Sequence, residues 1–139
     1  MRRIACIAAV ATLASACATQ PVPSSKATPV PDSRIFARDF VQPHDGRALL
    51  VVTRDKGLRA SVCAVGVHVD GTLVAELRPS EQVRLFVEEG EHLVGASSRT
   101  NTCFAGADQE AVTVTRAKPV LLRVSAGGGQ GLVIEPSAF

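Results

Sequence analysis

The 139-residue chain contains no tryptophan and no tyrosine, so phenylalanine is the only one of these three large aromatic residues that is present. Proteins that bind single-stranded nucleic acid stack bases on aromatic side chains, and many sugar-binding sites use similar stacking, so neither site is favoured. A strong net charge is also absent. The 15 lysines and arginines face 13 aspartates and glutamates, and the excess disappears if Arg2 and Arg3 are removed. The composition therefore gives no support to nucleic acid binding.

Long apolar runs are missing except near the N-terminus. Arg2 and Arg3 precede an uncharged run over residues 4–14. This run is too short for a membrane-spanning helix, which needs about 20 residues. A basic start, a short apolar run and small residues after it are typical of a secretory signal peptide. We therefore expect residues 1–16 to be a signal peptide that is cut off.

The stretch before Cys17 resembles a bacterial lipobox, in which the cysteine receives a lipid and becomes the mature N-terminus. Ala14 stands where the usual lipobox has leucine. A cut by ordinary signal peptidase after Ala16 or Ala18 is the alternative. The resemblance implies a membrane anchor at Cys17, and several acyl chains on one residue hold firmly where one chain is marginal. Because Ala18 is not the aspartate that retains many lipoproteins in the inner membrane, the outer membrane is expected, with the domain facing the periplasm.

Cysteine is scarce, and its four positions are informative: Cys6, Cys17, Cys63 and Cys103. Cys6 leaves with the signal peptide and a lipid would cap Cys17. An even pair then remains in an oxidising compartment, which favours a disulfide. We predict a bond between Cys63 and Cys103, for which the chain-entropy model gives roughly 4 kcal/mol. Two separate buried thiols are the alternative.

Proline is concentrated after Cys17, where residues 18–32 hold four of the eight prolines among serine, threonine and alanine. Such a composition does not usually build a core. It predicts that residues 17–33 form a flexible tether, which could lift a domain over residues 34–139 up to about 50 Å from the lipid.

Helical periodicity is nearly absent after the tether, and only residues 33–42 leave helix or strand open. Apolar residues instead alternate with polar ones, which indicates strands. Asp70-Gly71 is a typical hairpin turn, and Gly90 marks a second turn. Seven or eight short strands separated by turns predict an all-β, antiparallel sandwich. The predicted strands occupy residues 48–55, 61–70, 72–78, 81–88, 92–97, two halves of 110–127, and 131–139.

Part of this pattern resembles the PEGA-type domain and related lipoproteins of unknown function. The similarity covers roughly residues 48–139. Glu88-Glu89 is a departure, since a proline commonly precedes the glycine there. The resemblance implies an immunoglobulin-like or transthyretin-like sandwich without known catalysis. The matching residues are Val67, Val69, Asp70, Gly71 and Val74 in the first hairpin, and Leu85, Gly90, His92 and Val94 in the second.

Three histidines, His44, His68 and His92, are the main candidates for chemistry. A zinc site needs three or four suitable ligands. His68 and His92 are expected on the outward faces of strands that could be neighbours, and His44 in a turn. Exposed histidines without a metal are the favoured interpretation of all three.

The glycine run at residues 127–129 is followed by a predicted strand rather than by the helix that a phosphate-binding loop requires. Ser97, Ser98 and Ser125 lack the local motif of a hydrolase nucleophile. The sequence therefore predicts no catalytic residue, no metal and no cofactor.

These observations favour a non-catalytic module of the bacterial envelope, which supports the cell surface or binds an envelope protein or a cell-wall partner. A small envelope enzyme or enzyme inhibitor is the alternative. It would be favoured if the fold brought His68, His92 and carboxylates together in one concave pocket.

Overall fold

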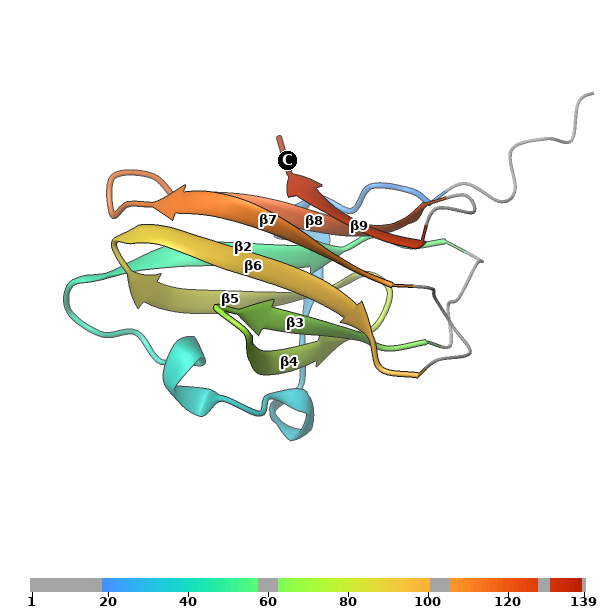
Figure 1. Ribbon diagram of the computed structural model, residues 1–139, viewed down its shortest axis with the longest axis horizontal. Coiled ribbons are helices and arrows are strands. Elements are labelled where there is room, and N and C mark those ends of the chain that lie inside the picture. The colour runs from blue at the N-terminus through green and yellow to red at the C-terminus, as the bar shows by residue number, and fades with distance from the viewer. Residues whose placement is uncertain (1–18, 58–62, 101–105, 128–130, 139) are drawn as a thin grey trace, which may run out of the picture.

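The computed structural model describes residues 19–57, 63–100, 106–127 and 131–138, which form two stacked β-sheets (Figure 1). One sheet has five strands in the order β1 (Thr28–Pro29), β5 (Glu81–Glu88), β2 (Arg47–Arg54), β8 (Val120–Gly127), β9 (Gly131–Pro136). The other has four strands in the order β4 (Thr72–Leu77), β3 (Val65–Val69), β6 (Gly90–Ser98), β7 (Ala107–Val114). The prediction of an all-β sandwich is confirmed, and none of the described helices is long and apolar enough to cross a membrane.

Two strand pairs run parallel, so the prediction of a wholly antiparallel sandwich is wrong. Leu50 of β2 lies beside Val120 of β8, and Thr28 of β1 lies beside Glu81 of β5. Parallel neighbours need a long crossover connection, and the chain between β2 and β8 includes all four strands of the other sheet. Alternation along one strand predicts its buried face, but it does not predict the direction of its neighbour.

The core between the sheets is aliphatic, as a chain without tryptophan and tyrosine requires. The alternation in β3 is confirmed, because Val65, Val67 and Val69 are fully buried. In β4, strict alternation predicts that Leu73, Ala75 and Leu77 share the buried face. This is partly wrong, since Val74 is fully buried and Leu73 is only half-buried. The pairing of β3 with β4 shifts register between Val67 and His68, and such a bulge breaks the alternation in which successive side chains change faces.

Both predicted turns are confirmed. Asp70 and Gly71 have φ values of 49° and 82°, the left-handed conformation of a tight hairpin turn between β3 and β4. Gly90 has a φ of 139° where β5 passes into β6. An L side chain rarely adopts that conformation, which explains a glycine at this crossing from one sheet to the other.

The prediction of a flexible tether over residues 17–33 is wrong for its described part, because that segment is bound to the domain. Gln20 and Lys56 form a β-bridge with hydrogen bonds of 2.7 and 3.1 Å. Ala27 and Val30 are buried, and Val30 belongs to the core. The 3-10 helix η1 (Ser24–Lys26) lies between these contacts and touches β2.

The prolines of this segment do not prevent its attachment, because Pro29 lies between two residues whose backbone amides donate hydrogen bonds. Thr28 and Val30 donate their amides to the carbonyls of Ser80 and Gln82, each at 2.9 Å. Pro29 lies between them, where an edge strand directs its nitrogen away from the sheet, so the missing hydrogen costs nothing. The composition suggested disorder, whereas the spacing of the prolines suits an edge strand.

Residues 33–42, left open by the sequence, form neither a regular helix nor a regular strand. They contain two 3-10 turns, η2 (Asp32–Arg34) and η3 (Arg38–Val41). Between them Ile35 makes an isolated bridge with Ala75, and Phe36 donates its amide to the carbonyl of Val74 at 2.7 Å. This segment therefore covers the free edge of β4.

Replacing Val30 with alanine should lower the free energy of unfolding by about 2 kcal/mol, because it removes two buried carbons from the core. Thr28→Ala, at an exposed position two residues earlier, is the matched control and should change little. Urea denaturation of both variants measures the difference. A flexible tether would instead make both changes neutral.

Candidate functional site

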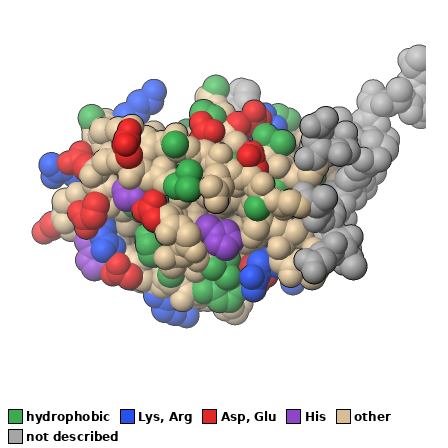
Figure 2. All heavy atoms as spheres, in the orientation of Figure 1, with side chains coloured by type: hydrophobic (Ala, Val, Ile, Leu, Met, Phe, Trp, Pro, Cys, Tyr) green, Lys and Arg blue, Asp and Glu red, His purple; other side chains and the backbone are tan. Residues whose placement is uncertain are grey.

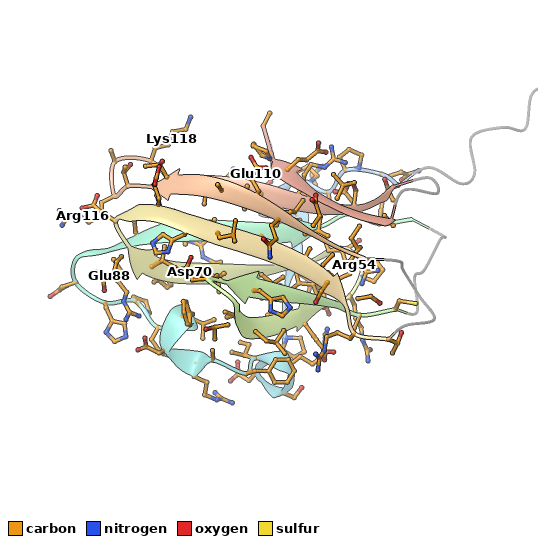
Figure 3. The ribbon with its side chains drawn as sticks, viewed as in Figure 1. Arg54, Asp70, Glu88, Glu110, Arg116 and Lys118 are labelled. Atoms are coloured by element: carbon orange, nitrogen blue, oxygen red, sulfur yellow. The ribbon has the colours of Figure 1, made fainter. Side chains whose placement is uncertain are left out.

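His92 joins the two sheets at the end of the sandwich that carries Asp70 and Glu88 (Figure 3). Its Nδ1 lies 2.7 Å from the Asp70 carboxylate, in the turn of the four-stranded sheet. Its Nε2 lies 2.8 Å from the Glu88 carbonyl, in β5 of the other sheet. The other Asp70 oxygen accepts the Leu93 amide at 2.9 Å. The expectation of an outward-facing His92 is wrong, since it shares the inward alternation of Val94.

Both ring nitrogens of His92 face acceptors, so both are best used as donors, which is the protonated form. Burial disfavours that charge, but the hydrogen bond with Asp70 and the one with the Glu88 backbone outweigh it, and the pKa of His92 is raised. Conversely, the bonds from Leu93 and His92 lower the pKa of Asp70. Asp70 and His92 therefore form an ion pair only while His92 carries its second proton.

His68 lies on the outward face of β3, as predicted, and its Nε2 is 2.8 Å from the hydroxyl oxygen of Ser97 on β6. Burial and the charge of Arg99 lower the pKa of His68, while a hydrogen bond with the Gly71 backbone opposes them. The ring is thus neutral at pH 7. The sequence motifs did not indicate this pair, because its members lie on different strands.

A neutral histidine beside a serine resembles the start of a hydrolase site, but the surroundings do not complete one. The third group on His68 is a backbone carbonyl group rather than a carboxylate. Strand β6 is paired on both sides, with β3 and with β7, so its amides are engaged in the sheet and do not form an oxyanion hole. The pair is best explained as a cross-strand polar contact.

The two histidines do not converge on one pocket. His92 is bound to Asp70 and Glu88, whereas His68 lines a separate shallow depression. His44 lies in an exposed turn, 3.4 Å from Asp39. Within the described parts of the chain, no three histidine, cysteine, aspartate or glutamate side chains lie close enough together to hold a metal ion. The condition stated for the enzyme alternative is thus not met there.

The predicted cysteine sites fall mostly outside the described residues. Cys17 and Cys103 both lie there, so lipidation and the disulfide stay predictions. Cys63 is buried and lies two residues before the start of β3. The glycine run also extends beyond the described residues, but Gly127 and Gly131 pair as the two ends of the β8–β9 hairpin, and a strand does follow the run.

Arg54 closes the other end of the sandwich. Only 4% of this residue is exposed. Its guanidinium donates to the carbonyl of Leu77 at 2.8 Å and to that of Cys63. Desolvation lowers the pKa of Arg54 to about 10, partly opposed by Glu81, so the side chain keeps its charge at neutral pH.

The outward side of β3, β6 and β7 forms an exposed surface of the four-stranded sheet. We call the following set, in which Glu91 is the only charged residue, the outer face: His68, Glu91, Leu93, Gly95, Ser97, Ala107, Gln109, Ala111 and Thr113. They lie side by side in the register of β3, β6 and β7. Figure 2 shows hydrophobic and uncharged atoms across the middle of this side of the molecule.

Two shallow depressions follow β6 and β7 along this face. One has a volume of about 350 Å³ and is lined by Leu93, Ala111 and Thr113 together with Asp70, Glu91 and His92. The other measures about 250 Å³ and includes His68, Ser97 and Gln109. Gly95 leaves the second one open, because the nearest atom to an added Cβ would be Gln109 Cγ at 3.5 Å. The two depressions suit an extended ligand better than a compact one.

Alternation within each strand predicted which residues point outward, but the outer face as a surface was not recognised from the sequence. It depends on the order β3-β6-β7, in which β3 and β7 lie on either side of β6. Comparison of the chain with protein-family models, with curated proteins and with solved structures gives no match. The functional argument therefore depends on the geometry of the chain itself.

The stability of the protein should fall as the pH rises above 6.5, the ordinary pKa of histidine. Because the pKa of His92 is raised in the folded state, protonated His92 contributes fully to stability below pH 6.5. This contribution is lost as the pH rises through the folded-state pKa of His92. Thermal unfolding between pH 5 and 9 measures it, and His92→Gln should remove this fall. His68→Gln is the control, because a lowered pKa acts below pH 6.5 and leaves the fall unchanged. An unaltered fall in His92→Gln would contradict the assignment.

Proposed function

We propose that the chain is a non-catalytic binding module of the bacterial cell envelope, held at the outer membrane by a lipid on Cys17 and exposed to the periplasm. The observation that carries the binding role is the mostly uncharged outer face with its two shallow depressions. The anchor is supported by the basic and apolar start of the chain and by the small residues before Cys17.

The outer face is favoured for binding because a sheet of this composition is unusual on a solvated surface. One in five residues of the chain is charged, yet Glu91, at one end, is the only charged position of the nine in the outer face. Leu93 is 41% exposed, with Ala111 directly across from it on β7. Exposed apolar surface bordered by polar groups commonly marks an interaction site. An envelope protein or a cell-wall strand in extended form would fit these depressions.

A disulfide between Cys63 and Cys103 is part of the same proposal, because it requires an oxidising compartment. The register of β3 with β6 supports the pairing. Val65 lies opposite Ser98, and Arg99 donates its amide to the carbonyl of Ala64 at 3.4 Å. Cys63 is next to Ala64 in the chain, and Cys103 follows Arg99 by four residues; this short separation from a described contact supports the proposed pairing.

Replacing Cys17 with serine should move the protein from the membrane fraction to the soluble periplasmic fraction, because the only lipid attachment site would be lost. Cell fractionation followed by immunoblotting measures this, and Cys6→Ser is the matched control that should stay with the membrane. A wild-type protein as soluble as the Cys17→Ser variant would contradict the anchor.

Ala111→Arg should reduce crosslinking to an envelope partner at least about tenfold, because it places a charged, long side chain in the depression beside Leu93. Ala117→Arg makes the same change in the exposed β7–β8 turn and should crosslink as the wild type does. Crosslinking in intact envelopes, followed by capture of the protein, measures both yields, and unfolding temperatures confirm that both variants fold. Equal yields from the two variants would exclude the outer face.

A further inference from the structure

We propose that the end of the sandwich that carries Lys56 and Arg78 rests on the anionic phospholipid headgroups of the membrane that holds the anchor. This proposal rests on the lipidation of Cys17 described above. It assigns to the domain a fixed orientation on the lipid surface, where the Pro-rich sequence had suggested free suspension on a tether.

The length of chain between the anchor and the domain is the first support. Gln20 is already bound to the domain, since it forms both hydrogen bonds of its bridge with Lys56. Gln20 is the third residue after Cys17. Each residue spans at most about 3.6 Å when fully extended, so Gln20 lies within roughly 11 Å of the lipid-bearing residue. The flexible tether would have allowed about 50 Å.

The attachment is continued beyond Gln20, so the domain does not swing on a single bridge. The Val22 amide lies 3.4 Å from the carboxylate of Asp55. Further along, Ala27 is buried and Val30 is part of the core. Separation of this segment from the domain would expose these side chains and break the edge pairing of β1 with β5, and both losses oppose it.

The charges at this end of the sandwich suit an anionic surface. Lys56 and Arg78 are exposed, and both lie near the buried Arg54, because Lys56 follows it by two residues and Ser80 donates its amide to the Arg54 carbonyl. Two of the neighbouring carboxylates are paired with arginines within the fold. Asp55 pairs with Arg123, and Glu81 pairs with Arg34 at 2.5 Å.

The opposite end has a different balance. Glu88 lies toward it in Figure 3, and Asp45, Glu89 and Glu91 belong to the same turns and strand ends. Arg47 and Arg116 pair with Glu88 and Glu89 there. Among the described residues, exposed Asp45 and Glu91 have no ion pair, and exposed Lys118 offsets only one of these two carboxylates. Anionic lipids attract lysine and arginine within about one Debye length, which is ~8 Å at physiological ionic strength. The basic end therefore favours the lipid surface, and the acidic end faces away.

The test measures the distance of each end from the membrane in the lipidated, full-length mature protein. A fluorescent amino acid is placed at Thr100, beside the basic end, or at Ala117, in the turn at the acidic end; both positions are exposed. The protein is reconstituted into vesicles of phosphatidylglycerol and phosphatidylethanolamine that contain a headgroup-labelled acceptor lipid. Energy transfer from position 100 should exceed that from position 117 several-fold.

Two matched variants separate reach from charge. A 15-residue Gly-Ser insertion between Ala18 and Thr19 should allow the domain to leave the surface, and transfer from position 100 should then fall, most of all when Lys56→Gln and Arg78→Gln are added. Equal transfer from positions 100 and 117 in the protein without the insertion would overturn the docked orientation while leaving the anchor intact. If the protein with Cys17 intact is not found in the membrane fraction, the proposed function itself is overturned.

Discussion

The buried guanidinium of Arg54 is the interaction on which the closed form of the sandwich depends. It extends from the last residue of β2 in one sheet to the carbonyls of Cys63 and Leu77, which flank strands of the other sheet. A charge taken out of water is costly unless its donors are satisfied, so the three segments must be held in place together. Val52 and Leu50, on the same strand, then lie fully within the aliphatic core.

The two ends of the sandwich are closed by different chemistry. Arg54 keeps its charge over the whole physiological range because its pKa remains at about 10. His92, at the other end, joins the sheets through both ring nitrogens, and these contacts raise its pKa. The Arg54 closure is thus permanent, whereas the His92 closure weakens when the ring loses its second proton. The outer face lies on strands that run between these two ends, and His92 lines one of its depressions.

The sequence predicts most of the strands but less of their assembly. Alternation located the buried face of β3, and the Asp70-Gly71 pair located its turn, because both signals are local. The prediction of a flexible tether was wrong because it relied on the composition around Pro29. The alternation of Thr28 and Val30, whose amides donate to the carbonyls of Ser80 and Gln82, was the better signal. The outer face and the bonds of His92 required knowledge of which strands are neighbours, and that is decided by packing across the whole chain.

The parallel pairing of β2 with β8 has a consequence for how the protein is made. Leu50 lies beside Val120, so an early strand of the five-stranded sheet lacks one of its two neighbours until nearly the whole chain is available. Contacts between residues so distant in sequence slow folding, because a long loop must close before they form. During synthesis from the N-terminus, the five-stranded sheet is therefore completed only after β8 and β9 have followed the four strands of the other sheet.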